Sequence, residues 1–401
     1  MVSTNTASSV RGGDSVSEAY VISANRTPIG EFRKGLGGLS GTELASVIIR
    51  TILERSSVSP ADVSEVILGN VIQGGQGMNP ARQAAVRGGL PYSVPAYTVN
   101  MVCASGLQAV LLADQAIRAG RASCILAGGF ESMSNAPHVI QSLREGVPLG
   151  NAAVDDLLVK DGLWDSFYDC HMAETVERLV QKRGISRQAQ DSYALSSHLK
   201  AAAARDEGRF DDEVFAVADE RAQLARDERP RADTSLEKLG RLRPAFRKDG
   251  TITAGNASGL NDGAALLMLS ADKQGAGAPR AVIQDSATVA VDPVDMGVAP
   301  SLAIRRLLES SHLQIDDIDL WEVNEAFGGQ VLAVLQDVDI PEDSLNVNGG
   351  SIALGHPIGC SGARILVTLL HEMWRREAEL GVAALCVGGG LGMAVLVRLE
   401  R

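Results

Sequence analysis

Apolar residues recur along the chain with two different spacings. The short runs at 125–129 and 385–389 are continuously apolar and end in Gly-Gly, which is typical of strands covered on both faces. In two other segments the apolar residues return every three to four positions, the period of a helix with one buried face. These residues are Leu107, Val110, Leu111 and Ile117, and then Ile365, Leu366, Leu369, Leu370 and Met373. The pattern predicts an α/β fold.

The predicted elements form an internal repeat. The order helix, strand, glycine-rich turn, helix, strand occurs twice along the chain. The first copy begins with the helical pattern at 44–54 and the strand at 65–69, and the second with the helical pattern at 302–309 and the strand at 320–323. We therefore expect two similar α/β halves packed together.

A polar, charge-dense stretch separates the two copies. Residues 132–260 contain pairs such as Asp155-Asp156 and a helical pattern that Ser186 would cap, and they are expected to form a loop domain inserted into the first half and to act as a substrate lid. The predicted domains are a disordered leader at 1–17, an N-terminal half at 18–131 plus 261–282, the loop domain at 132–260, and a C-terminal half at 283–401.

Charge and cysteine usage exclude several classes of protein. The 49 acidic residues against 37 basic ones give a net charge of −12, which disfavours binding to nucleic acid or to an anionic membrane. The apolar stretch at 382–397 is too short and too rich in glycine to span a bilayer. Five widely spaced cysteines without a C-x-x-C pair indicate neither disulfides nor a metal site, so a reducing, cytoplasmic location is expected.

Cys103 and His356 are candidates for nucleophilic catalysis. Cys103 stands just before a predicted helix whose start is signalled by Ser105 and Gln108, a capping-box pattern, and a thiol at a helix N-terminus is favoured as thiolate. His356 lies between Gly355 and a proline, on a stiff turn where an imidazole could remove the thiol proton. The alternatives are a small buried cysteine and a histidine whose hydrogen bonds are satisfied on the surface or in the core.

The end of the second repeat offers further candidates. Cys386 ends a predicted buried strand and could shuttle a proton, and the backbone N–H of Gly388 could face an oxyanion. Asn324 follows another strand, and its amide could hold a water molecule or a carbonyl, with an Asx turn as the alternative. Cys124 and Cys360 are assigned to packing.

These residues occur in motifs that resemble the thiolase family, most closely its short-chain biosynthetic branch, from about residue 18 to residue 401. The motifs stand in the family's order and are specific in combination. They are Asn100-x-x-Cys103-Ala104-Ser105-Gly106, Asn324-Glu325-Ala326-Phe327, Gly355-His356-Pro357-x-Gly359 and Cys386-x-Gly388-Gly389-Gly390.

The resemblance implies a five-layer αβαβα fold with two pseudo-repeated halves and an inserted loop domain. It also implies the activity of an acetyl-CoA C-acetyltransferase, which condenses two acetyl-CoA reversibly to acetoacetyl-CoA and CoA. In that scheme Cys103 carries the acetyl group, His356 activates it, and Cys386 removes a proton from the second acetyl-CoA. One oxyanion site would use His356 with a water held by Asn324, and the other the N–H groups of Cys103 and Gly388.

The resemblance extends to substrate binding and assembly. It implies that coenzyme A thioesters are substrates rather than cofactors, that no metal takes part, and that the chain forms a homotetramer, a dimer of dimers, with residues 73–83 near the dimer interface. The residues that it assigns to the pantetheine and acyl pocket are His171, Met172, Ser258, Ala326 and Phe327.

Three other functions remain open at this stage. A broader-chain 3-ketoacyl-CoA thiolase differs only in the length of acyl chain it accepts. A non-catalytic acyl-CoA carrier would need none of the reactive residues. A decarboxylating ketoacyl synthase lacks a thiol corresponding to Cys386.

Overall fold

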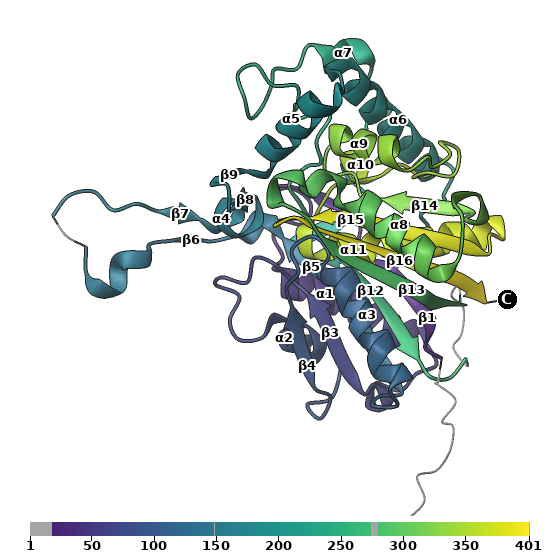
Figure 1. Ribbon diagram of the computed structural model, residues 1–401. Coiled ribbons are helices and arrows are strands. Elements are labelled where there is room, and N and C mark those ends of the chain that lie inside the picture. Colours follow the sequence, from purple (N-terminus) through teal and green to yellow (C-terminus); the bar gives the residue numbers. More distant parts are fainter. Residues whose placement is uncertain (1–17, 148, 274–279, 401) are drawn as a thin grey trace, which may run out of the picture.

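The computed structural model describes residues 18–147, 149–273 and 280–400 (Figure 1). The leader predicted at 1–17 lies outside the described residues. Among the helices of the described ranges, none is both long and apolar enough to cross a membrane.

The first half is built on a mixed five-stranded sheet. β3 runs parallel to β4 and to β5, whereas β12 pairs antiparallel with β5 and with β1. The strands are, in spatial order, β4 (Ala96–Val99), β3 (Glu65–Gly69), β5 (Cys124–Ser132), β12 (Asn261–Ser270) and β1 (Tyr20–Arg26), and β2 (Gly30–Glu31) pairs with the start of β12.

The second half repeats this arrangement with four strands. β14 runs parallel to β15, and β15, β16 and β13 follow one another antiparallel. The strands are β14 (Leu320–Val323), β15 (Leu380–Val387), β16 (Leu391–Glu400) and β13 (Arg280–Ala290). The two sheets join at one corner only, where β1 and β13 share the pairs Tyr20↔Val282 and Val21↔Ala281.

Helices cover both sheets and fill the space between them. One apolar core is formed by the central helices with the inner faces of the two sheets, and a separate core lies on each outer face. The central helices are α3 (Ser105–Arg118) and α11 (Ile358–Arg376), the outer pair of the first half is α1 (Gly41–Arg55) and α2 (Pro80–Arg87), and that of the second half is α8 (Ala299–Ser311) and α9 (Gly328–Asp337). These layers confirm the predicted αβαβα order.

The two central helices cross at glycines. A Cβ atom on Gly106 of α3 would lie 2.9 Å from the carbonyl oxygen of Gly359, and one on Gly362 of α11 would lie 2.8 Å from Cβ of Leu107. Real Cβ atoms are not found that close to other heavy atoms. The glycines therefore bring the backbones of the two halves into direct contact, which places the beginnings of α3 and α11 side by side.

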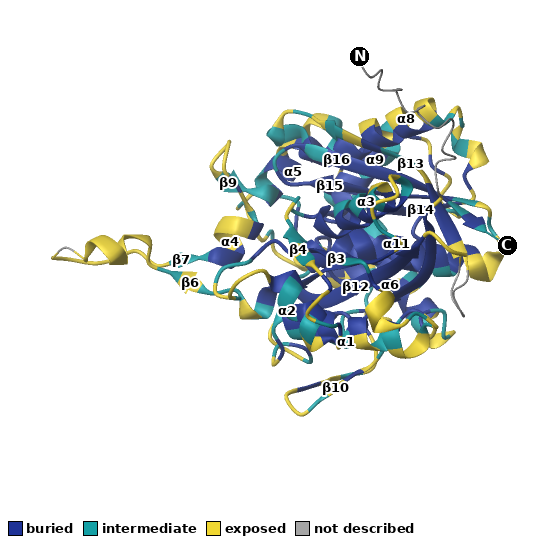
Figure 2. Cartoon of the chain, turned by 90° about the horizontal axis from the view of Figure 1, so that it is seen from below, coloured by how far each residue is buried: buried dark blue, intermediate teal, exposed yellow. Residues whose placement is uncertain are grey.

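Residues 132–260 carry short elements beside the two halves. Ser186 caps α6 by accepting from the backbone N–H of Ala189, as expected. The helices are α4 (Leu157–Gly162), α5 (Met172–Arg183), α6 (Arg187–Asp206) and α7 (Leu236–Gly240), and the strand pairs are β6 (His138–Val139) with β7 (Asp155–Asp156), β8 (Trp164–Asp165) with β9 (Cys170–His171), and β10 (Val217–Asp219) with β11 (Ala222–Leu224). The β6–β7 arm projects from the body and is largely exposed (Figure 2).

A buried ion cluster ties this segment to the first sheet. Arg26, the last residue of β1, donates to Glu213 and forms a two-pronged pair with Asp227, and all three side chains are buried. The remaining elements are the short helix α10 (Ser351–Leu354) and the 3-10 turns η1 (Pro60–Asp62), η2 (Met133–Asn135), η3 (Gln141–Glu145), η4 (Pro293–Val298) and η5 (Ile315–Asp317).

Candidate active site

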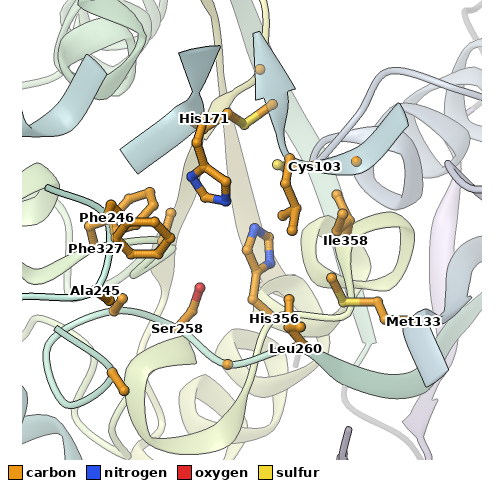
Figure 3. A pocket seen from close by; sticks show the side chains of 18 of the residues that line it. Cys103, Met133, His171, Ala245, Phe246, Ser258, Leu260, Phe327, His356 and Ile358 are labelled. Atoms are coloured by element: carbon orange, nitrogen blue, oxygen red, sulfur yellow. The ribbon is translucent and has the colours of Figure 1, made fainter. Parts of the chain in front are cut away.

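A cavity of about 340 Å³ opens where the two halves meet the 132–260 segment (Figure 3). Its lining includes every predicted site residue except Asn324. That residue directly follows β14 in the chain and is buried. The predicted residues that line it are Cys103, His171, Met172, Ser258, Ala326, Phe327, His356, Cys386 and Gly388. Residues from opposite halves of the repeat therefore share one cavity.

The backbone before Cys103 is strained. Val102 has a φ of 47°, which is unfavourable for a β-branched residue. The predicted capping box is wrong, because α3 begins after Ala104 with no side-chain cap. Ser105 instead accepts from the N–H of Met101 and donates to the carbonyl of Val102, so its hydroxyl holds the strained turn together. This turn fixes Cys103 just before the N-terminus of α3.

The expectation that Cys103 rests as a thiolate is also wrong. Burial raises the pKa of its thiol to about 11, although the backbone N–H groups of Gly388 and of Cys103 itself act in the opposite direction. Desolvation outweighs the two N–H groups because the thiol is almost completely enclosed. In the free protein the thiol is therefore neutral at pH 7, and it needs a base.

His356 is placed to be that base. Gly355, with a positive φ of 116°, and Pro357, at the N-cap of α11, hold it on the predicted stiff turn. The backbone N–H of His356 donates to Oδ1 of Asn261. Nδ1 lies 2.5 Å from Oγ of Ser361, which leaves Nε2 open to the cavity. Burial, with a smaller contribution from the charge of Arg364, lowers the pKa of the ring to about 4. The imidazole is neutral and able to take a proton.

Cys386 brings a second sulfur from the other half. It is the next-to-last residue of β15 and is buried, and burial and then the neighbouring Cys103 raise its pKa far above that of an ordinary thiol. Cys103 and Cys386 line the same cavity. Gly388 stands two residues further along, and a Cβ atom there would lie 2.4 Å from Cε of Met172, so the end of the Met172 side chain packs directly over the Gly388 backbone.

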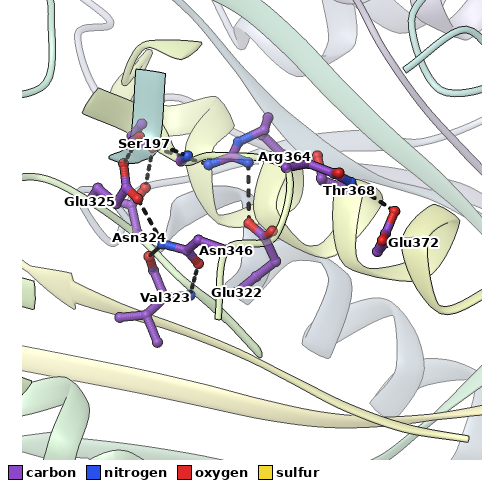
Figure 4. A network of polar contacts seen from close by, with 12 residues as sticks. Ser197, Glu322, Val323, Asn324, Glu325, Asn346, Arg364, Thr368 and Glu372 are labelled. Carbon is purple, nitrogen blue, oxygen red and sulfur yellow. Dashed lines mark hydrogen bonds and ion pairs between the residues drawn. The ribbon is translucent and has the colours of Figure 1, made fainter. Parts of the chain in front are cut away.

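Asn324 belongs to a network of buried polar side chains (Figure 4). Its backbone N–H donates to the carbonyl of Ala384, and its side-chain Oδ1 accepts from Oγ of Ser351 at 2.6 Å. Nη2 of Arg364 in turn donates to Oγ of Ser351 at 3.1 Å. Nδ2 of Asn324 is buried and has no hydrogen-bond partner among the described residues. The side chain does not form the alternative Asx turn, since its oxygen is taken by Ser351.

The next residue, Glu325, anchors the 132–260 segment to the second half. Its carboxylate accepts from the hydroxyls of Tyr193 and Ser197 on α6, from the amide of Asn346 and from the N–H of Ile352. Sequence analysis did not single out this cluster, because the four donors come from two parts of the chain, 193–197 and 346–352, of which the first is far from Glu325 in sequence. Its effect is to fix the backbone on which Asn324 stands.

Aromatic rings form one wall of the cavity. His171 stacks on Phe246 with 4.5 Å between ring centroids, and Phe246 meets Phe327 edge to face at 6.5 Å. Nδ1 of His171 accepts from the N–H of Ala173, and burial lowers the pKa of the ring. The backbone N–H of Ser258 donates to the carbonyl of Ala326. Lining residues that sequence analysis missed include Met133, Arg229, Phe246, Leu260 and Met296.

The two cysteines assigned to packing lie away from this lining. Cys124 belongs to the outer core of the first half, and Cys360 belongs to the central core on α11. Burial raises the pKa of both thiols, that of Cys360 to about 12. The five cysteines are free thiols.

Comparison with known proteins agrees with this architecture. The chain is 50% identical over 391 residues to the "Probable acetyl-CoA acetyltransferase" of Escherichia coli (strain K12), covering 96% of this chain and all of that protein. A crystal structure of the Bacillus anthracis acetyl-CoA acetyltransferase superimposes with a TM-score of 0.92 at 41% identity, covering 96% and 99% of the two chains. Human mitochondrial 3-ketoacyl-CoA thiolase in complex with CoA gives 0.92 at 39% identity, covering 96% and 98%.

Two family models account for almost the whole chain. Residues 19–273 match "Thiolase, N-terminal domain" and residues 277–399 match "Thiolase, C-terminal domain". With the five layers and the relatives above, these matches establish that the chain belongs to the thiolase family.

Proposed function

We propose that the protein is an acetyl-CoA C-acetyltransferase, which joins two acetyl-CoA reversibly into acetoacetyl-CoA and CoA. The observation that carries the proposal is the meeting of two thiols, Cys103 and Cys386, and a neutral imidazole, His356, in one cavity. The relatives named for acetyl-CoA acetyltransferase activity, at 41% to 50% identity along nearly the whole chain, support the same substrate.

In the first half-reaction the sulfur of Cys103 attacks the thioester carbonyl of acetyl-CoA while Nε2 of His356 takes its proton. The N–H groups of Cys103 and Gly388 already face the sulfur, so they are available to the oxyanion that develops beside it. The bond between the carbonyl carbon and the CoA sulfur then breaks, and Cys386 protonates the departing thiolate. The products are acetyl-Cys103, CoA, an imidazolium and a Cys386 thiolate.

In the second half-reaction the Cys386 thiolate removes a proton from the methyl carbon of another acetyl-CoA. A thioester methyl group is a weak acid, so the raised pKa of Cys386 suits this step because it makes the thiolate a strong base. The carbanion forms a carbon–carbon bond to the acetyl carbonyl, the bond to Cys103 breaks, and the imidazolium of His356 returns its proton to Cys103. We propose that Asn324 supports the enolate oxygen through a water molecule.

Residues 132–260 act in this proposal as the coenzyme A-binding loop domain. They supply His171, Met172 and Ser258 to the cavity, and Ala326 and Phe327 complete the binding surface. The stacked rings of His171 and Phe246 form one wall of this surface. A broader 3-ketoacyl-CoA thiolase is the second candidate, favoured by the 0.92 superposition on the human enzyme. Relative kcat/KM for acetoacetyl-CoA and longer 3-ketoacyl-CoA distinguishes the two.

The decisive experiment traps the acyl-enzyme in a variant that cannot condense. Cys386→Ala should still accept an acetyl group on Cys103 from acetyl-CoA, more slowly than the wild type, because CoA can depart as a thiolate without the proton of Cys386. It should condense at least about 100-fold more slowly, since general acid–base groups contribute about 10²- to 10⁴-fold and no other thiol replaces the base that acts on the methyl group. Intact-protein and peptide mass spectrometry then locate an added acetyl group. Cys124→Ala, a buried thiol away from the cavity, is the matched control and should behave as the wild type.

Other outcomes reject the proposal. If wild-type protein forms no acetyl-CoA from acetoacetyl-CoA and CoA, or if Cys103→Ala retains that activity, the assignment is wrong. Binding of acetyl-CoA without any acetylation of Cys103 would instead support the non-catalytic carrier. Condensation that depends on a malonyl thioester would support the decarboxylating synthase.

Assembly into a homotetramer in the cytoplasm is part of the proposal. Large apolar side chains stand exposed on two parts of the surface: Met78 and Tyr92 in and beside the 73–83 segment, and Leu143, Leu149 and Val154 on the β6–β7 arm. Such side chains are typical of interfaces, and a second copy of the chain would cover them. Five free thiols fit a reducing compartment. Sedimentation equilibrium measures the assembly.

A further inference from the structure

The amide of Asn324 can face its surroundings in two ways, because either its oxygen or its NH₂ group can point towards Ser351. The choice decides whether the free end of the side chain is a hydrogen-bond donor or an acceptor. The side chain is fully buried, so the free end cannot exchange partners with bulk water. What fixes the orientation therefore decides what the free end can bind.

The hydrogen bonds of Ser351 settle this choice. A guanidinium has no acceptor, so Nη2 of Arg364, 3.1 Å away, can only donate to Oγ of Ser351. The single hydroxyl proton of Ser351 is then directed to Oδ1 of Asn324 at 2.6 Å. If the amide were reversed, two donor groups would converge on Oγ and the hydroxyl proton would lose its acceptor. The chain of bonds runs from cation to hydroxyl to amide oxygen.

We propose that Ser351 and Arg364 are positioning residues that hold Asn324 with its NH₂ group as the free end. The buried Nδ2, which lacks a partner among the described residues, is the group so presented. Its complement is an acceptor oxygen, either of a water molecule or of a bound thioester. This inference rests on the proposed function, in which Asn324 supports an enolate oxygen.

Stability alone does not explain the buried arginine. Arg364 is enclosed on α11, its closest ion-pair contact to Glu322 is 3.4 Å, and its Nε has no partner among the described residues. A buried cation with such loose compensation costs desolvation energy that an apolar side chain would avoid. Its bond to Ser351, together with its effect in lowering the pKa of His356, connects it to two groups of the site.

A double-mutant cycle tests the inference through kcat. Ser351→Ala should lower kcat for thiolysis by about tenfold or more with little change in KM, but by no more than Asn324→Ala, since a single oxyanion donor is worth about 10²- to 10³-fold. In the Asn324→Ala background, Ser351→Ala should cost nothing further, because its only route to the reaction has been removed. Ser351→Thr, which keeps the hydroxyl, should restore most of the activity.

The structure provides a matched control in Ser197. It is buried like Ser351 and lies in the same network (Figure 4). Its Oγ accepts from the N–H of Gly350 and donates to Glu325, and neither of these bonds involves the side chain of Asn324. Ser197→Ala should leave kcat close to the wild-type value, because Tyr193, Asn346 and the N–H of Ile352 still hold Glu325, and should lower kcat of Asn324→Ala no further. If Ser351→Ala and Asn324→Ala losses multiply, or if Ser351→Ala is silent while Asn324→Ala is impaired, the inference is wrong.

Neutron diffraction from a deuterated crystal of the wild-type protein tests the orientation without reference to activity. Two deuterium atoms on the amide nitrogen that faces away from Ser351, and one on Oγ directed at Oδ1, are expected. Deuterium atoms on the amide end that faces Ser351 would overturn the inference. A wild-type protein without thiolysis would overturn the proposed function, and the neutron map would still decide the orientation of the amide.

Discussion

In both halves of the molecule a pair of parallel strands ends with the same arrangement of residues, but the residues beyond the two ends make different contacts. In the first half, the last pair between β3 and β5 is Gly69↔Gly129, Asn70 follows β3, and Glu131 stands two residues further along β5. In the second half, the last pair between β14 and β15 is Val323↔Ala384. By the same count, Asn324 and Cys386 occupy the places of Asn70 and Glu131.

The end of the first half is closed by hydrogen bonds. Asn70 donates to Oε1 of Glu131 at 2.6 Å, and the same carboxylate accepts from the backbone N–H groups of Val71, Ile72 and Gly359. Each of these donors is used within the protein. One carboxylate thus fastens the start of α11, which belongs to the second half, to the first sheet.

The corresponding end of the second half is left open. Nδ2 of Asn324 has no partner among the described residues, and Cys386 lines the cavity. The duplicated scaffold therefore supplies one saturated end that holds the halves together and one unsaturated end, which in the proposed function binds a reacting molecule. The difference teaches that a structural repeat need not duplicate a functional site. Where all polar groups at the strand ends hydrogen-bond within the protein, the same arrangement only holds the two halves together.

The strongest test of this comparison replaces the two asparagines in turn. Asn324→Ala should reduce kcat for thiolysis by about 100-fold or more, the value of a lost oxyanion donor. Asn70→Ala should leave kcat little changed and instead lower the melting temperature, because it removes a buried partner of Glu131. Steady-state kinetics and thermal melting of both variants measure the two effects. Similar kinetic losses in both would contradict the division of roles.

A second test compares the sulfurs contributed by the two halves. The pKa of Cys103 is raised to about 11 and that of Cys386 is raised further, so both are neutral thiols at pH 7. Alkylation of Cys103 by iodoacetamide should therefore accelerate about tenfold per pH unit from pH 7 to pH 9, because only the thiolate reacts. Peptide mass spectrometry should find Cys103 modified before Cys386. A rate independent of pH in this range would indicate a preformed thiolate–imidazolium pair instead.

The smallest kinetic effect is expected at the closed end. Glu131→Gln replaces a carboxylate oxygen with an NH₂ group, so at least one backbone N–H of the cluster loses its acceptor, at a cost of about 1–3 kcal/mol in unfolding free energy. The kcat of the folded variant should remain close to the wild-type value, because the charge of Glu131 raises the pKa of Cys103 far less than burial does. Thermal melting followed by assays below the transition measures both quantities. A large loss of kcat without a lower melting temperature would place Glu131 in the chemistry.

Much of the fold could be predicted from the sequence because its signals are local. The strands at 65–69 and 320–323 coincide with β3 and β14, since short apolar runs between turns define buried strands well. The cap of α6 was predicted for the same reason. The capping box at Ser105 failed because its hydroxyl is used by the strained turn at Val102, which no residue pattern announces.

The site was predicted only in part. Cys103, His356 and Cys386 could be proposed from their places in the repeat and from the motifs. The raised pKa of Cys103 could not, because it depends on how completely distant segments enclose the thiol. Phe246 was missed since no periodicity marks a single ring in a loop. The relay through Ser351 was missed because its hydrogen bonds join three separate elements.

The crossing of α3 and α11 limits how the site can move. At Gly106 and Gly362 the backbones of the two helices are in contact, with no side chains between them whose rearrangement would let the helices shift. The separation of Cys103 and His356, which stand just before α3 and α11, is consequently a fixed dimension of the scaffold. In the proposed mechanism the imidazole therefore meets the thiol at a distance that the scaffold sets, and each acetyl-CoA must come to these two groups rather than the groups to it.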